Sequence, residues 1–121
     1  MAVIGLALWI AGCTHGSRLA APTTVSVPAQ ALLAPAELAA VRAQIHAIAT
    51  THCGRCHRAS LPTAKPAALA IYNLDAENWS STLSAAQLEG GFTRRLHGRL
   101  DESGRRLLQT FVSNESALRR K

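Results

Sequence analysis

The sequence predicts a single all-α domain, and three observations support this fold class. Apolar residues recur at spacings of three and four in separate stretches, as they do along one face of a helix. Residues that commonly start helices stand before each of these stretches. No stretch alternates between apolar and polar residues over the length of a strand. With 121 residues, of which 48 % are hydrophobic, the chain has room for one modest core and excludes a two-domain enzyme.

The first predicted helix begins at Pro35 and runs toward Cys53. Proline suits the first helical position, where its missing N–H would have had no partner, and Glu37 places a negative charge in the first turn. The apolar face is Leu38, Val41, Ile45 and Ile48. After this helix, Pro62 and Pro66 predict a largely irregular segment over residues 58–68, and residues 67–72 favour a short helical turn.

The C-terminal third predicts two more helical runs. Ser84 and Gln87 form a capping-box pattern that opens the first run, and the pair Gly90–Gly91 is expected to interrupt it. Its apolar positions are Leu88, Phe92 and Leu96. Asp101 is the expected N-cap of the last helix. The apolar side of that helix is Leu107, Leu108, Phe111, Val112 and Leu118.

The N-terminus has the pattern of an export signal. Residues 1–12 carry no charge, and they are too few for a membrane-spanning helix, which needs about 20 residues. Residues 10–13, Ile-Ala-Gly-Cys, resemble the bacterial lipobox, although no Lys or Arg precedes the apolar stretch. The resemblance implies lipidation of Cys13 and export to the periplasmic side of a bacterial membrane. A plain signal or short anchor, and a buried helix with an inert cysteine, are the alternatives.

The expected organisation of the chain follows from this pattern. Residues 1–12 are the signal segment, and residues 13–34 are a tether, because they contain two prolines and show no sustained periodicity. Residues 35–121 are the folded domain.

The chemistry-bearing motif is C-x-x-C-H at Cys53, Cys56 and His57, which is typical of c-type haem attachment. Two thiols three positions apart suit the two vinyl groups of one porphyrin edge, and the histidine is then positioned as the proximal iron ligand. A dithiol site would require a strand–helix context, which this chain does not predict. A zinc site would require adjacent Cys56 and His57 to reach one tetrahedral ion. The motif therefore predicts one covalent haem c.

On these residues, the chain over 35–118 resembles the small class I cytochrome c domain. A helix leads into the motif, a proline-bearing loop follows, and the last helix carries Phe111. The resemblance implies that the first and last helices cross and that the haem fills space that aromatic side chains would otherwise occupy. It also implies that a backbone carbonyl after the motif, near Pro62 or Pro66, accepts the N–H of the proximal imidazole. Tyr72 and Trp79 are either propionate contacts or ordinary core aromatics.

The second axial position departs from that family. Class I cytochromes place a methionine there, but the only methionine is Met1, so methionine ligation is excluded. His97, just before the last helix, is the expected distal iron ligand, although helical phase turns it about 100° away from Leu96. Lys65 and an open or water-bound iron are the alternatives.

The predicted function is electron transfer, with no enzymatic activity, by a membrane-tethered periplasmic carrier or an accessory redox subunit. The alternative is a haem-based ligand-binding sensor or weak peroxidase with an open distal site. The formal net charge is +6, and basic residues crowd the C-terminal third. This charge suits an acidic redox partner protein or anionic lipid heads beneath the anchor. Nucleic acid is not an expected partner, because the chain has too few aromatic residues to form a platform on which bases could stack.

Overall fold

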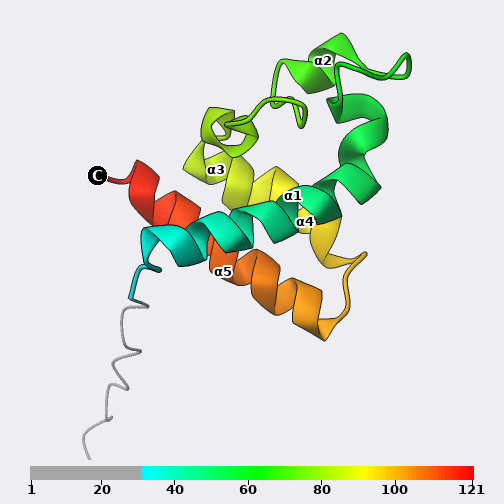
Figure 1. Ribbon diagram of the computed structural model, residues 1–121. Helices are drawn as coiled ribbons and strands as arrows, with labels where there is room; N and C mark the ends of the chain where they lie inside the picture. Colours follow the sequence, from blue (N-terminus) through cyan, green and yellow to red (C-terminus); the bar gives the residue numbers. More distant parts are fainter. Residues whose placement is uncertain (1–30) are drawn as a thin grey trace, which may run out of the picture.

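The computed structural model describes residues 31–121, and all regular elements in this part are helical (Figure 1). The signal segment, Cys13 and most of the predicted tether lie outside the described residues. The elements in order are α1 (Pro35–His57), α2 (Pro66–Leu69), the 3₁₀ turn η1 (Trp79–Thr82), α3 (Ala85–Gln87), the π-helical η2 (Leu88–Phe92), α4 (Thr93–His97) and α5 (Glu102–Arg119). The all-α prediction is confirmed for this part of the chain.

The first helix, α1, begins at Pro35 as predicted. The Glu37 carboxylate accepts a hydrogen bond from the Ala34 backbone N–H at 3.0 Å and so satisfies one donor before the helix. The helix continues without a break through the C-x-x-C-H motif and ends at His57. The motif therefore occupies the last turns of a 23-residue helix.

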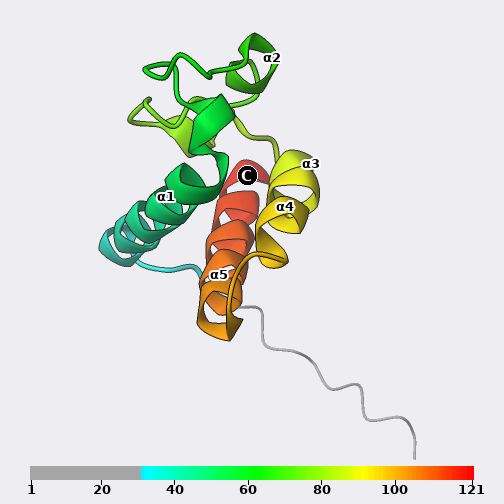
Figure 2. The same cartoon turned by 90° about the vertical axis from the view of Figure 1, so that its right-hand side faces the viewer.

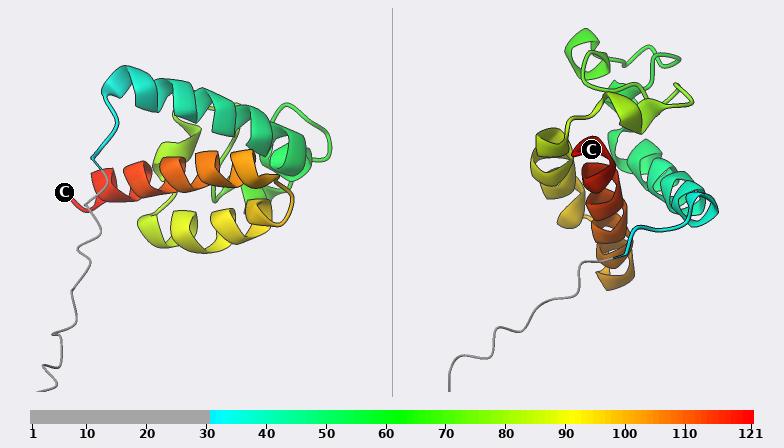
Figure 3. Two further views of the ribbon diagram at one scale, coloured as in Figure 1. Left: turned by 90° about the horizontal axis from the view of Figure 1, so that it is seen from below. Right: turned by 90° about the vertical axis from the view of Figure 1, so that its left-hand side faces the viewer.

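Helix α5 lies in the middle of the fold. The views in Figures 2 and 3 show α1 on one side of α5 and the run from α3 to α4 on the other. Helices α1 and α5 run in opposite directions, and they pack against each other. This bears out the expected packing of the first and last helices. The segment 58–78, called here the 58–78 loop, projects from the C-terminal end of α1 and carries α2 (Figure 1).

The core contains aromatic side chains from three parts of the chain. Trp79 and Phe111 stack with ring centroids 5.8 Å apart, and Phe92 contacts both rings. Tyr72 lies at the edge of this group, 7 % exposed. Trp79 and Tyr72 are thus core residues. Aliphatic residues complete the core, namely Leu38, Ile45, Leu74, Leu83, Leu88, Leu96 and Leu108.

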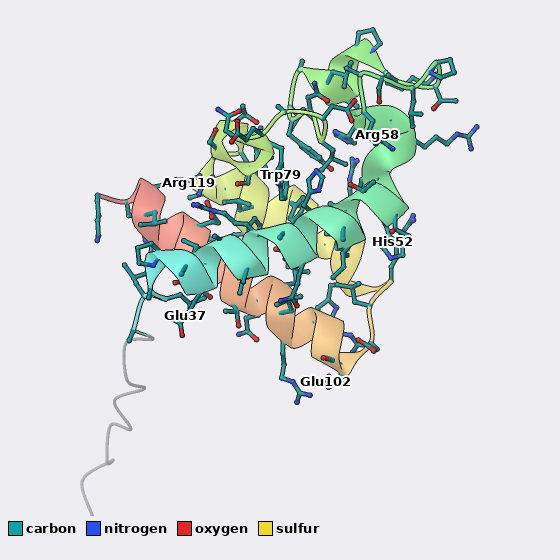
Figure 4. All side chains as sticks on the ribbon, in the orientation of Figure 1. Glu37, His52, Arg58, Trp79, Glu102 and Arg119 are labelled. Carbon is teal, nitrogen blue, oxygen red and sulfur yellow. The ribbon has the colours of Figure 1, made fainter. Side chains whose placement is uncertain are left out.

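A buried carboxylate joins three of the elements. Glu115 on α5 is 2 % exposed and forms ion pairs with Arg42 of α1 and with Arg119 one turn further along α5. Arg119 also donates to the backbone carbonyl oxygens of Leu83 and Ser80 (Figure 4). These bonds fix the segment around Trp79 to the end of α5, and they satisfy a charge that would be costly to bury alone.

The C-terminal third differs from the prediction in two details. Gly90–Gly91 does not break the helical run, but lies in the wider π turn η2 between α3 and α4. A π turn of this kind absorbs one extra residue without ending the helix. Leu118 was expected on the apolar side of the last helix, but it is 40 % exposed, and it is the neighbouring Arg119 that contacts the segment around Trp79. The predicted caps are confirmed: Ser84 and Gln87 bond reciprocally, and Asp101 accepts from the Gly104 N–H.

Candidate functional site

The C-x-x-C-H motif lies where α1 meets the 58–78 loop. Cys53 and Cys56 are free thiols, both half-buried, and Arg58 marks the start of the loop in Figure 4. One helical turn separates the two cysteines, so both thiols lie on neighbouring parts of the same helix surface. The structure therefore presents a pair of accessible thiols directly before His57.

The His57 imidazole is held by the backbone of the loop. The ring is 6 % exposed, and its Nδ1 lies 3.1 Å from the carbonyl oxygen of Tyr72. A carbonyl oxygen only accepts, so Nδ1 carries a proton and donates it to Tyr72, and Nε2 is the nitrogen left for any other partner. The carbonyl thus comes from Tyr72, further along the loop than the expected positions near Pro62 and Pro66. The ring of Tyr72 also stacks on the imidazole, with centroids 3.8 Å apart.

Two further bonds hold the loop in this position. The Leu74 N–H donates to the His57 carbonyl oxygen at 2.7 Å, and the Leu74 carbonyl oxygen lies 2.7 Å from His46 Nε2. Residues 72–74 are therefore bonded to two histidines of α1. Sequence reasoning assigned His46 no part in the site, because a side-chain-to-backbone bond across the fold leaves no signature in spacing.

The start of the loop is held by Asp75. Its carboxylate accepts from the Ser60 backbone N–H at 2.8 Å and from Arg58 Nε at 3.0 Å. The hydrogen bond from the Ser60 backbone, followed by that from Arg58, lowers the pKa of Asp75 from 3.8 to about 2. The ionised carboxylate thus connects the two ends of the segment that follows His57.

Cys53 and His57 both line a cavity of about 320 Å³. Its opposite wall comes from the run α3–η2–α4 and includes Gly90, Gly91 and Arg94. A Cβ atom added to Gly91 would meet nothing within 4 Å, and one added to Gly90 would meet only the Arg94 guanidinium, at 3.9 Å. The two glycines therefore leave space that a side chain would otherwise fill.

Tyr72 lies at the junction between this cavity and the motif. Burial raises the pKa of its phenol well above the usual value, and the adjacent Cys53 acts in the same direction. The phenol is thus neutral at physiological pH. Tyr72 stacks on His57 and lines the same cavity as Cys53, so it lies beside two residues of the motif.

The structure does not bring His97 together with the motif. Its side chain is exposed, and it lines a different cavity, of about 480 Å³, together with Glu89 and Thr93. Residues 89, 93 and 97 share one helical face, whereas Gly90 and Arg94 face the cavity of Cys53. The sequence indicated that His97 turns away from the apolar face of Leu96, and in the structure Leu96 is buried whereas His97 is exposed.

Lys65, the other residue considered for that position, also lies elsewhere. It is exposed in the 58–78 loop, where its backbone N–H donates to the Cys56 carbonyl oxygen. It does not line the cavity of Cys53 and His57. Sequence reasoning missed Arg94 and Arg95 as cavity residues, although Arg94 stands four positions after Gly90 and so shares its helical face.

Within residues 31–121, no three His, Cys, Asp or Glu side chains gather closely enough to hold a metal ion. In the same range, no helix is both long and apolar enough to cross a membrane. Comparison with protein-family models, with curated proteins and with solved structures finds no match to this chain.

Proposed function

We propose that the chain binds one c-type haem covalently through Cys53 and Cys56 and transfers electrons. The observation that carries this proposal is the orientation of His57. Its Nδ1 donates to the Tyr72 carbonyl oxygen, and its ring lies at the edge of a cavity that Cys53 also lines. A metal-binding histidine in proteins almost always donates its other ring N–H in this way, which fixes the ring and makes the ligating nitrogen more basic.

The donor set fits a covalently attached haem. Two free thiols stand one turn apart, so each can form a thioether bond with one vinyl group on the same porphyrin edge. His57 follows at once, and because its Nδ1 is taken by the Tyr72 carbonyl, Nε2 is the nitrogen that would bind the iron. The apolar part of the cavity wall includes Leu83 and Phe92, which suits a macrocycle that must be shielded from water.

When bound, the haem supplies one-electron chemistry, since its iron cycles between the ferric and ferrous states. The chain provides His57, whose basicity is set by the Tyr72 carbonyl, and a partly closed, partly apolar cavity that tunes the potential. A reduced partner protein would supply the electron, and an oxidised partner would accept it. Among the cavity residues, Arg94 and Arg95 are exposed, and their charge favours an acidic partner.

The location proposed for this reaction is the periplasmic side of a bacterial membrane. Attachment of haem to a C-x-x-C-H motif takes place after export, which agrees with the apolar N-terminal segment. Lipidation of Cys13 would keep the domain at the membrane by a tether of about 20 residues. The protein is then a tethered carrier or an accessory subunit of a larger oxidoreductase.

The proposal is tested by the mass of the chain under denaturing conditions after expression in a bacterium that matures c-type cytochromes. We expect the mass of the protein plus one haem, and acid-acetone extraction should leave the haem in place. The double variant C53A/C56A should lose the haem. The control R55A changes an exposed position inside the motif and should retain it. A wild-type chain that matures without haem mass contradicts the proposal.

A further inference from the structure

The cavity wall opposite His57 offers no usual iron ligand. Within residues 31–121, the side chains that line this cavity include no methionine, no lysine and no histidine other than His57. Tyr72 has the one phenol there, and it stacks on the His57 imidazole itself. The run α3–η2–α4 contributes Gln87, Gly90, Gly91, Arg94 and Arg95 to this cavity, besides the apolar Ala86 and Phe92. None of these is an ordinary protein ligand of haem iron.

The same wall is open at its centre. Gly90 and Gly91 lie in the π turn η2, and a Cβ atom on Gly91 would stand in empty space. π turns of this kind are frequent at functional sites, because they shift the helical register locally. The Arg94 guanidinium lies nearest to Gly90, at 3.9 Å from the position of an added Cβ atom. A small molecule at the glycine pair would therefore have a fixed positive charge beside it.

We infer that the coordination position opposite His57 binds a small anion, which Arg94 and Arg95 hold by charge and hydrogen bonding. This inference rests on the proposed haem attachment and adds a ligand class to it. The two guanidinium groups present donors and no acceptors, so they favour an anion over a neutral ligand of the same size. Both arginines are also exposed, so solvent weakens the interaction and salt screens it.

The experiment titrates the haem-loaded full chain with azide in the ferric state and with carbon monoxide in the ferrous state, followed by the visible absorption spectrum. We expect both to bind, and we expect azide affinity to fall as ionic strength rises. R94Q and R95Q should each weaken azide binding about three- to fivefold, and the double variant about tenfold, with carbon monoxide affinity nearly unchanged.

The matched control is R106Q, which removes the same charge from an exposed arginine of α5 that pairs with Glu102. Arg106 does not line the cavity of His57, so azide affinity should stay within a factor of two. If R106Q weakens azide as much as R94Q does, the effect is one of net charge and the assignment of the arginines is wrong.

The outcomes separate this inference from the proposed function. A chain with haem mass that binds neither azide nor carbon monoxide has a protein ligand at this position, which overturns the inference and leaves haem attachment intact. A chain without haem mass refutes the proposed function itself. Binding of both ligands, with azide alone sensitive to Arg94 and Arg95, supports the inference.

Discussion

The imidazole of His46 and the carbonyl oxygen of Leu74 lie 2.7 Å apart and join the middle of α1 to the 58–78 loop. Leu74 also donates its backbone N–H to the His57 carbonyl oxygen. The carbonyl oxygen of Tyr72, two residues before Leu74, accepts a hydrogen bond from the His57 ring. The orientation of His57 thus depends on a loop that His46 holds in place. His46 is a positioning residue by this route, since it acts on His57 only through Leu74 and Tyr72.

Replacement of His46 by alanine should lower the free energy of unfolding by about 1–2 kcal/mol, because it leaves the Leu74 carbonyl oxygen without its partner. Urea denaturation followed by circular dichroism measures this loss. The control is H52A, a half-buried histidine on the same helix with no side-chain hydrogen bond to the described residues. Equal destabilisation by H46A and H52A would show that the bond to Leu74 does not hold the loop.

The carboxylate of Glu115 is expected to be the most sensitive polar group of the fold. E115A leaves Arg119, of which only 19 % of the side chain is exposed, without its charge partner and opens a gap beside α1. A loss of about 3 kcal/mol is expected from removal of one partner of a buried pair. E102A removes an ion pair in which both side chains are about 70 % exposed, and should cost less than about 0.5 kcal/mol. Urea denaturation compares the two variants, and similar losses would contradict the role of burial.

Asp75 predicts how stability depends on pH. Its pKa falls from 3.8 to about 2 on folding, through the bonds from the Ser60 N–H and Arg58. A group with a lowered folded-state pKa stabilises the fold above its unfolded pKa, and it loses this contribution as the pH falls through the folded value. The wild type should therefore lose stability more steeply than D75N between about pH 4 and pH 2.

Thermal unfolding at a series of pH values checks this prediction. The control is E77Q, because Glu77 is exposed and forms no ion pair with the described residues. E77Q should retain the steep dependence of the wild type. If the unfolding temperatures of the wild type and D75N fall equally as the pH is lowered, protonation of Asp75 does not affect the stability of the fold.

The helices were predictable because each depends on signals that are close in sequence. Pro35 and Glu37 at the start of α1, the Ser84–Gln87 capping box and Asp101 all act within one turn of the helix they begin. The π turn at Gly90–Gly91 was not predictable, because a glycine pair in a helical pattern favours a break and nothing local marks a widened turn. The neighbouring packing of η2 against α5 decides between these outcomes, and that contact is distant in sequence.

The candidate site was predictable from the sequence only where the proposed haem attachment requires particular residues at a fixed spacing along the chain. Cys53 and Cys56 stand at the spacing that attachment to one porphyrin edge would require, and His57 follows directly. The carbonyl of Tyr72 is a backbone group, so no residue type marks it. Arg94 was recognised only as part of a basic region, because its place in the cavity depends on how the run α3–η2–α4 packs on α5.

Cys13 lies outside the described residues, and its lipidation is a prediction from the Ile-Ala-Gly-Cys pattern at residues 10–13. Metabolic labelling with a radioactive fatty acid should mark the wild type and not C13A. The control C53A changes a cysteine of the haem motif and should remain labelled. Label in C13A, or none in the wild type, would reject lipidation and leave export to be decided separately.

The last prediction concerns His97, which the sequence offered as the distal ligand. Because His97 is exposed and lines the cavity of Glu89 and Thr93, H97A should leave the spin state of the ferric holoprotein and its carbon monoxide affinity unchanged. Electronic absorption and electron paramagnetic resonance measure the spin state. The wild type should also lack the weak near-infrared band of sulfur ligation, because Met1 is the only methionine. A wild type that is low-spin and excludes carbon monoxide, together with a high-spin H97A that binds it, would establish His97 as the ligand. The run α3–η2–α4 would then have to turn by roughly one residue of helical phase, about 100°, when the haem is attached.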